Sequence, residues 1–226
     1  MPARLRPTAP IAADAILVGD PGRALMLAQE LLEAPKMSNH ARGLWGYTGR
    51  TQAGRELSLQ STGIGGPSAA LVLADLVELG VRRAVRVGTC TGLRAGTSLG
   101  DLALVEEAHA WGGPGGREGE AVLPDPGLTA ALRSALGEKD GGAAVASLDT
   151  LHGEDPSEGP IAADAADMQT AALFARGARL GIRVAAVLVV DAVAAGERLE
   201  EEAAEEAAKR AGRAAAEALA QAEVEG

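Results

Sequence analysis

The sequence predicts a single α/β domain in which a central mixed β-sheet is flanked by helices. Segments of strand type alternate with segments of helix type along the 226 residues, which is the pattern of a sheet covered by helices. The strand segments are mostly apolar, as expected for strands that are buried on both faces. We find no internal repeat and no interdomain linker, so one domain is expected over residues 1–226.

Each predicted strand is a short apolar run bounded by turn residues such as glycine, proline and aspartate. In chain order, the predicted strands cover residues 15–19, 44–50, 56–60, 84–88, 102–107, 143–148 and 183–191. The second and third of these flank a turn at Ala53-Gly54 and are therefore predicted to form a hairpin.

Each predicted helix shows apolar residues at spacings of three and four. In chain order, the predicted helices cover residues 23–34, 68–79, 128–136, 164–179 and 199–223. The first follows the break at Asp20-Pro21-Gly22, and the second follows a tight glycine loop at 62–67 and ends at Gly80. The last is rich in alanine and glutamate, which indicates a solvated helix packed through an alanine stripe. Polar or glycine-rich loops are expected at 112–119 and 152–160.

The charge balance and the few metal-binding side chains argue against several classes of protein. With 31 acidic and 21 basic residues the net charge is −10, which is unfavourable for a general binder of nucleic acid or anionic membranes. A single cysteine, Cys90, allows no intrachain disulfide and no multi-cysteine zinc site. The three histidines, His40, His109 and His152, are far apart along the chain, so a metal enzyme is not expected.

The sequence also carries expectations about where the protein acts. No run of about 18 apolar residues occurs, so no transmembrane helix is predicted. Residues 1–10 contain three prolines and no apolar stretch, which is not the pattern of a signal peptide. We therefore expect a cytoplasmic protein.

Three arginines beside glycine or tight-turn residues are the strongest candidates for binding an anion. Arg23 follows Gly19-Asp20-Pro21-Gly22, where a strand is succeeded by a helix whose N-terminal N–H groups favour negative charge. Arg86 begins Arg86-Val87-Gly88-Thr89 at the C-terminal end of a strand, where open α/β sheets bind ligands. Arg42-Gly43 precedes the predicted hairpin. A single arginine is usually a surface residue that forms ion pairs. Two arginines, Arg23 and Arg86, both placed at predicted strand ends beside glycine, instead favour a site that binds an anion.

Five short motifs occur in order along most of the chain. They are ILVGDPGRA (16–24), NHARGLWGYTG (39–49), STGIGGPSAA (61–70), RVGTCTG (86–92) and DMQTA (167–171). With these motifs the chain resembles the nucleoside phosphorylase and uridine phosphorylase superfamily of hexameric type. The succession of GDPGR, RGLWGYTG and RVGT is far more specific than a single glycine motif. TGIGG lacks the GxGxxG spacing, so a dinucleotide site is not predicted.

The resemblance implies a phosphate site made by Gly19, Arg23, Arg86 and Thr89, to which a neighbouring subunit lends Arg42. Inorganic phosphate would attack the anomeric carbon of a nucleoside while the base leaves through an oxocarbenium-like transition state. A nucleophile with up to two negative charges needs several fixed cations, which agrees with three arginines. The resemblance implies no metal or organic cofactor, phosphate being a co-substrate. It also implies a homo-oligomer, with a dimer as the smallest active unit and a hexamer as the full assembly.

The sugar side of the implied site departs from the family pattern. Ile64 and Met168 would line the ribose. The family usually has Glu-Met-Glu where this chain has Asp167-Met168-Gln169, and the second glutamate holds the ribose hydroxyls. Gln169 can accept one hydrogen bond and donate another, but it lacks the carboxylate charge that favours a cationic transition state. Alternatively, Gln169 is a helix residue with no ligand role.

The implied proton donor is also displaced. In purine-cleaving members a Ser-Asp pair follows the last strand, and this aspartate protonates the departing base. Here the strand ends in Val189-Val190-Asp191-Ala192, and strict spacing places Ala192 at the acid position. A slip of one residue would restore Asp191 as a general acid with a raised pKa. Alternatively, Asp191 caps the turn that follows.

The residues near the expected base position do not reveal which base is bound. Leu151 and His152 lie there in place of the aromatic side chains usual in the family. His152 could bond a base or a ribose, or could be a solvated loop residue. The Gln-x-Arg pairing by which pyrimidine-specific members recognise uracil is missing. Cys90 has no histidine base beside it in the sequence and is predicted to be a packing residue.

The leading hypothesis is therefore a phosphate-dependent nucleoside phosphorylase, a pentosyltransferase whose partners are a small nucleoside and phosphate. A nucleosidase of the same fold is an alternative, but water as the nucleophile has no use for three arginines. A non-catalytic homologue that binds nucleoside or phosphate is a second alternative, motivated by Gln169 and Asp191.

Overall fold

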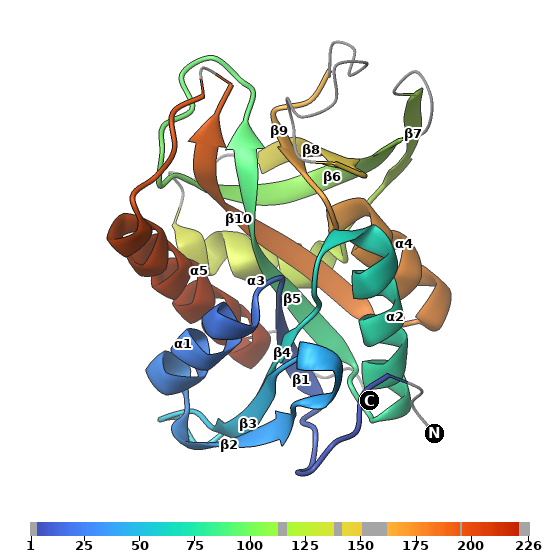
Figure 1. Cartoon of the computed structure of the whole chain (residues 1–226), viewed down its shortest axis with the longest axis vertical. Helices are drawn as coiled ribbons and strands as arrows, with labels where there is room; N and C mark the ends of the chain where they lie inside the picture. Colours follow the sequence, from blue (N-terminus) through green and yellow to red (C-terminus); the bar gives the residue numbers. More distant parts are fainter. Residues whose placement is uncertain (1–3, 113–116, 138–141, 151–161, 195, 222–226) are drawn as a thin grey trace.

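The computed structural model describes residues 4–112, 117–137, 142–150, 162–194 and 196–221, and the ten strands found there form one mixed sheet (Figure 1). The strands are β1 (Asp14–Val18), β2 (Glu33–Asn39), β3 (Gly46–Arg50), β4 (Glu56–Ser61), β5 (Arg83–Gly92), β6 (Leu102–Gly112), β7 (Arg117–Val122), β8 (Gly142–Leu148), β9 (Ala165–Asp167) and β10 (Arg183–Val193). The helices are α1 (Pro21–Leu31), α2 (Gly65–Glu78), α3 (Pro126–Leu136), α4 (Thr170–Leu180), α5 (Glu201–Gln221) and the short 3₁₀ helix η1 (Ala41–Gly43).

The centre of the sheet is parallel. β1 pairs in parallel with β4 and with β5, and β5 pairs in parallel with β10 along almost its whole length. Because these strands run in the same direction, the carboxyl ends of β1, β5 and β10 meet at one edge of the sheet. This is the edge at which open α/β sheets bind ligands.

Five of the strands form a closed circuit. The sheet follows the order β10-β6-β8-β9-β5, and β5 pairs back onto β10. The short strand β9 completes the circuit, since it pairs with β8 and also with Thr91 and Gly92 at the end of β5. This pairing brings Asp167, the last residue of β9, to the carboxyl end of β5.

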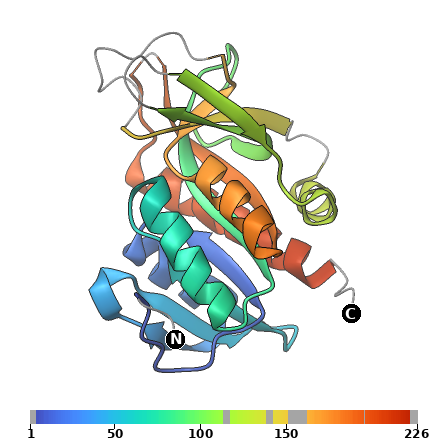
Figure 2. The ribbon, with the colours of Figure 1, turned by 90° about the vertical axis from the view of Figure 1, so that its right-hand side faces the viewer.

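Helices cover both faces of the central strands, with α2 and α4 on one face and α1, α3 and α5 on the other (Figure 2). The alternation of β5 divides its residues between two buried clusters. Ala84 and Cys90 belong to the cluster under α2 and α4, whereas Val85 and Val87 belong to the cluster under α1, α3 and α5. Arg86 therefore points to the same side as Ala84.

Most of the predicted elements are confirmed. The predicted hairpin is the antiparallel pair β3–β4, and the apolar runs at 15–19, 84–88 and 183–191 lie within or overlap β1, β5 and β10. The alanine stripe of the last helix is buried, and Ala207, Ala211 and Ala215 are its central members. The α/β fold class with a mixed sheet flanked by helices is thus confirmed.

Several predicted elements are wrong at their ends, and the strands expected to end at residues 88 and 107 continue to Gly92 and Gly112. The helix expected over 164–179 begins only at Thr170, because residues 165–167 pair as β9 with β5 and β8. The loop expected over 112–119 is shorter, because β7 starts at Arg117 and pairs with β6. In both places hydrogen bonding to distant strands prevails over local sequence preference. The loop expected at 152–160 lies outside the described residues.

The strand β2 was not predicted. The helix expected to reach residue 34 ends at Leu31, and β2 begins at Glu33. Ala34, with a φ of 45°, lies where the pairing of β2 with β3 is irregular, between Glu33 and Lys36. β2 is the last strand in the sheet order and pairs only with β3 among the described strands. It contains Pro35 and mostly polar residues, which an edge strand tolerates and a central strand does not.

The described helices include none that is long and apolar enough to cross a membrane.

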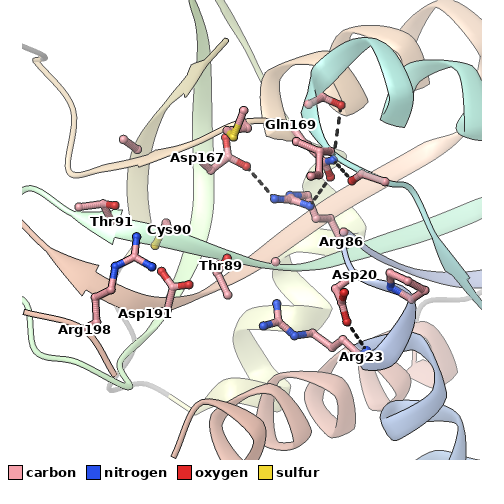
Figure 3. Close-up of a pocket in the computed structure, with 18 residues that line it drawn as sticks. Asp20, Arg23, Arg86, Thr89, Cys90, Thr91, Asp167, Gln169, Asp191 and Arg198 are labelled. Atoms are coloured by element: carbon pink, nitrogen blue, oxygen red, sulfur yellow. Dashed lines mark hydrogen bonds and ion pairs between the residues drawn. The ribbon is translucent and has the colours of Figure 1, made fainter. Parts of the chain in front are cut away.

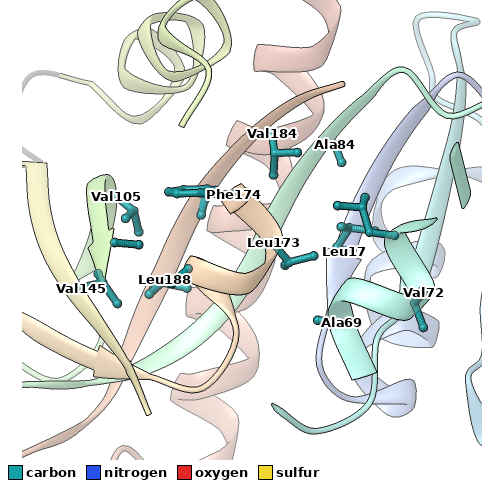
Figure 4. Packing of buried hydrophobic residues seen from close by; sticks show 14 of the residues in the cluster. Leu17, Ala69, Val72, Ala84, Val105, Val145, Leu173, Phe174, Val184 and Leu188 are labelled. Carbon is teal, nitrogen blue, oxygen red and sulfur yellow. The ribbon is translucent and has the colours of Figure 1, made fainter. Parts of the chain in front are cut away.

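The core under α2 and α4 should be sensitive to cavities. Phe174 of α4 is 2% exposed and lies in this cluster with Val184 and Leu188 of β10 (Figure 4). Phe174→Ala is expected to lower the free energy of unfolding by about 3–5 kcal/mol, because the ring leaves a cavity that the core fills only in part. Urea denaturation at fixed protein concentration measures this change. Leu123→Ala, at a side chain that is 65% exposed, is the control and should change stability by less than about 0.5 kcal/mol.

Candidate active site

A pocket of about 690 Å³ opens at the carboxyl ends of β1, β5 and β10. Its walls come from the loop after β1, the end of β5, the start of α2, the segment between β9 and α4, and the chain after β10 (Figure 3). The size is that of a site for a small organic ligand. Five segments that are distant in sequence therefore meet around one cavity at the sheet edge that favours ligands.

The pocket gathers most of the residues predicted from the sequence. Eight of them line it, namely Gly19, Arg23, Ile64, Arg86, Thr89, Met168, Gln169 and Asp191. Arg42 is exposed in η1 and is not among the lining residues of this chain. Leu151 and His152 lie outside the described residues.

Arg86 is buried in the wall of the pocket and is held by α4 and the residues before it. Its Nη1 donates to Gln169 Oε1 at 2.8 Å and its Nη2 to Asp167 Oδ2 at 2.9 Å (Figure 3). Its Nε donates to Thr170 Oγ1 at 3.1 Å. A guanidinium has five N–H groups, so two remain without a partner in the described part of the chain. Because Arg86 lines the pocket, these two are the groups available to an anion.

Asp167 is the anionic partner of Arg86, and its carboxylate is fully hydrogen-bonded. Oδ1 accepts from Ser147 Oγ at 2.5 Å, and Oδ2 accepts from Thr170 N at 3.0 Å and Thr170 Oγ1 at 2.5 Å. Charged groups persist in the interior when they are paired and their remaining sites are bonded. The sequence analysis gave Asp167 no role of its own, although it stands in the same DMQTA motif as Met168 and Gln169.

Gly88 leaves the space in which the guanidinium of Arg86 lies. Residues 86 and 88 point to the same side of β5. A Cβ atom at position 88 would stand 2.6 Å from Arg86 Cζ, which is closer than atoms can approach. Glycine is therefore required here for the arginine to fold back along its own strand.

Arg23 supplies the second cation, from the first turn of α1. Its guanidinium projects into the pocket and makes no hydrogen bond to another described residue (Figure 3). Burial lowers the pKa of Arg23, and the charges of Asp191 and Asp20 oppose this shift. The N-terminus of α1 is less open than expected, because Asp20 Oδ1 accepts a hydrogen bond from Arg23 N at 2.8 Å and caps the helix.

A β-bulge aims Asp191 into the pocket. In the parallel pairing of β10 with β5, Val190 faces Cys90 and Ala192 faces Thr91, so Asp191 is an extra residue with no partner of its own. Asp191 lines the pocket, whereas Ala192 is buried and does not. The bulge therefore turns Asp191, and not Ala192, toward the pocket.

The surroundings of Asp191 favour its protonated form. Burial raises the pKa of this carboxyl, and the hydrogen bond from Thr89 and the positive charges of Arg23 and Arg198 only partly oppose the rise. A carboxyl with a raised pKa at the wall of a pocket is suited to donate a proton.

Arg198 is a pocket residue that the sequence analysis missed. The chain after β10 turns back, and Leu199 N donates to Asp191 O at 2.8 Å. The backbone of Arg198 forms an isolated antiparallel β-bridge with that of Ala192. This turn places the guanidinium of Arg198 beside the carboxyl of Asp191 (Figure 3). The available signal was a basic residue in the short connection between the last strand and the last helix.

Cys90 lines the pocket at the end of β5 but is buried within the core cluster under α2 and α4. Burial, with the nearby charges of Asp167 and Asp191, raises the pKa of its thiol well above the usual range. A thiol in this state is a poor nucleophile. The structure agrees with the interpretation of Cys90 as a packing residue.

Comparison with known proteins places this geometry in a family. The family model described as the phosphorylase superfamily matches residues 14–222. The chain therefore belongs to the phosphorylase superfamily, as the five motifs indicated.

Several relatives align over most of the chain, and each is named purine nucleoside phosphorylase DeoD-type. The protein from Clostridium perfringens is 31% identical over 207 residues, which cover 85% of this chain and 87% of the relative. The protein from Geobacillus kaustophilus is 31% identical over 209 residues, covering 86% of this chain and 87% of the relative. The protein from Caldanaerobacter subterraneus subsp. tengcongensis is 29% identical over 207 residues, covering 85% and 88%.

The half-buried carboxyl of Asp191 should make the fold less stable at neutral pH. Its pKa is raised above the ordinary 3.8, so the folded state disfavours the ionised form, and stability falls as the pH rises from 3.8 through the folded pKa. Asp191→Asn is therefore expected to raise the melting temperature at pH 7, and this gain should shrink near pH 4. Differential scanning calorimetry at both pH values measures it. Glu33→Gln, the same charge change at an exposed residue, should show no such gain.

Proposed function

We propose that the protein is a purine nucleoside phosphorylase. It cleaves the N-glycosidic bond of a purine nucleoside with inorganic phosphate and releases the free base and ribose 1-phosphate or 2-deoxyribose 1-phosphate. The observation that carries the proposal is the arrangement of the buried Arg86, the half-buried Arg23 and a carboxyl with a raised pKa around one pocket of a phosphorylase-superfamily chain. The names of the relatives support a purine as the base.

Phosphate binds between Arg23 and Arg86 in this proposal. Arg23 offers a guanidinium that makes no hydrogen bond to another described residue, and Arg86 offers two fixed N–H groups. Gly19 and Thr89 line the same part of the pocket. Fixed cations hold the nucleophile in line with the anomeric carbon and lower its repulsion from the substrate oxygens. Phosphate is a co-substrate, and the proposed reaction uses no metal or organic cofactor.

The base leaves as Asp191 gives it a proton. Phosphate oxygen forms the new bond to the anomeric carbon as the bond to the purine nitrogen breaks, and the electron pair of that bond goes to the base. The proton of the Asp191 carboxyl neutralises the charge that builds up on the leaving base. Arg198, beside Asp191, then stabilises the carboxylate that remains.

The sugar occupies the part of the pocket between the phosphate and base sites. Ile64 and Met168 line this part, and both are apolar side chains suited to the carbon face of a pentose. Ile64 is 82% exposed although it is a large apolar residue at the pocket rim. We propose that a further surface covers this rim when the site is complete.

A second copy of the chain is the proposed cover. Arg42 adopts a left-handed backbone conformation with a φ of 61°, which is strained for a residue other than glycine and is typical of functional positions. The segment that carries it packs on the pocket rim, since Leu44 Cδ2 would lie 3.3 Å from a Cβ atom at Gly63. Arg42 and Trp45 are exposed on this segment. We propose a homo-oligomer in which Arg42 reaches the phosphate site of the adjoining subunit, and cytoplasmic action of that assembly.

The activity is tested by measuring base release from inosine, adenosine, guanosine, uridine and methylthioadenosine, with and without phosphate. Release of purine only with phosphate is expected. Arg23→Ala should lower kcat/KM for phosphate by about a hundredfold or more, because it removes a charge-assisted contact to the nucleophile. Base release without phosphate would identify a nucleosidase. Tight nucleoside binding without cleavage would identify a non-catalytic homologue.

The shared site is tested by mixing two inactive variants. Arg42→Ala and Arg23→Ala are each expected to be nearly inactive alone. After subunit exchange, a mixed pair contains one pocket with its own Arg23 and the neighbour's Arg42, so part of the activity should return.

Activity that stays absent, in mixtures whose exchange is verified by mass spectrometry, would show that Arg42 does not act across an interface. Light scattering of the wild type gives the oligomeric state independently, and a monomer at working concentration would contradict the proposal.

A further inference from the structure

The side-chain amide of Gln169 is surrounded by polar groups of its own chain. Its Oε1 accepts from Arg86 Nη1 at 2.8 Å and lies 3.0 Å from Thr62 Oγ1, whose single proton is shared between Gln169 and Val18 O. Its Nε2 donates to Gly63 O at 2.6 Å and, more weakly, to Gly65 O at 3.4 Å. Both the acceptor and the donor end of the amide therefore face groups of the chain. With 4% of its surface exposed, Gln169 has no free group to offer a sugar hydroxyl.

We propose that Gln169 is a positioning residue of the phosphate site, which holds Arg86 and the 63–65 loop in place and does not bind the sugar. The proposal rests on the proposed function, and it replaces the ribose contact implied by the sequence resemblance. Gln169 acts through two other groups, the guanidinium of Arg86 and the backbone of the loop that leads into α2.

The first consequence concerns the direction of the Arg86 N–H groups. Gln169, Asp167 and Thr170 bind three of them from one side, and the two that remain belong to Nη1 and Nη2. A guanidinium fixed in this way needs no reorientation when an anion arrives. Without the amide oxygen of Gln169, Nη1 would lose its partner, and only the bonds to Thr170 and Asp167 would hold the guanidinium.

The second consequence concerns the loop. Gly63 and Gly65 both have a positive φ, and both line the pocket together with Ile64. Their carbonyl oxygens point at Gln169 Nε2, so a donor is required at this position. A carboxylate has none and would face two carbonyl oxygens, which is unfavourable. The arrangement therefore suits an amide and excludes a glutamate of the same length.

The proposal is tested by isothermal titration of the wild type and variants with inorganic phosphate alone. Gln169→Leu is expected to weaken phosphate binding by about tenfold or more, since an N–H of a charged group loses its partner. Thr62→Val changes a residue that does not line the pocket and contacts Gln169 from behind, and it should weaken binding by about threefold. Gln52→Leu, the same substitution on the exposed β3–β4 turn, should leave phosphate affinity unchanged.

A second readout separates positioning from sugar binding. We compare kcat/KM for inosine and 2′-deoxyinosine in the wild type and in Gln169→Leu. The ratio of the two values should stay within about twofold, because Gln169 does not touch the 2′-hydroxyl, while KM for phosphate rises. Gln169→Glu should not restore phosphate affinity, since it cannot donate to Gly63 O.

The outcomes that overturn the proposal are distinct from those that overturn the function. Unchanged phosphate affinity in both Gln169→Leu and Thr62→Val contradicts positioning, as does a ribose preference that disappears in Gln169→Leu. If Gln169→Leu does not fold, Thr62→Val alone decides. A wild type that binds phosphate but cleaves no nucleoside refutes the proposed function, and the titrations still judge the role of Gln169. A wild type that does not bind phosphate refutes both.

Discussion

The buried ion pair between Arg86 and Asp167 is the interaction on which the rest of the pocket depends. Both side chains are almost fully removed from water, which costs free energy unless every charge and lone pair is bonded. Ser147, Thr170 and Gln169 supply those bonds, and Ser147 also accepts from the backbone of α4 at Ala171 N, 2.9 Å away. The start of α4, the end of β8 and the middle of β5 are thereby joined through polar groups. These polar contacts depend on the closed circuit of strands. Asp167 lies close to β5 because β9 pairs with the carboxyl end of β5.

The charges that line the pocket are nearly balanced within one chain. Three are positive and three are negative, namely Arg23, Arg86 and Arg198 against Asp20, Asp167 and Asp191. Asp167 is committed to Arg86 and Asp20 to the cap of α1, so their charges cannot move away when an anion enters. Protonation of Asp191 removes one negative charge and leaves a net positive pocket. The raised pKa of Asp191 therefore favours anion binding as well as proton donation.

The central fold could be predicted from the sequence because each central strand is recognisable from its own short stretch of residues. β1, β5 and β10 are apolar runs followed by glycine or aspartate, and the helices between them have regular apolar spacing. The strands β2 and β9 could not be predicted in this way. β2 is a polar edge strand that contains a proline, and β9 is three residues long and exists only through its pairing with β5 and β8.

The candidate site was predicted in part for the same reason. Arg23 follows the turn after β1 and Asp191 lies near the end of β10, where sequence and location are linked. Arg86 was expected at the end of a strand, but β5 continues to Gly92 and Arg86 lies in its middle. The partners of Arg86 are residues 167, 169 and 170, and Ser147 in turn bonds Asp167. Nothing in local sequence tells which buried polar groups will pair across the sheet. Arg198 enters the pocket through a turn whose geometry depends on the bulge before it. What the sequence does not show is therefore the set of long-range polar contacts.

The bulge at Asp191 divides β10 into two parts with separate tasks. Up to Val190 the strand alternates strictly, and its side chains fill the cores on both faces of the sheet. After the bulge the alternation starts afresh, because the extra residue reverses which side each later residue faces. The direction of the Asp191 side chain is thus independent of the alternation that directs the earlier residues of β10 into the core. Residue 191 can be exchanged for another type without repacking Val187 or Leu188, so the chemistry at this edge can vary while the interior of the sheet stays the same.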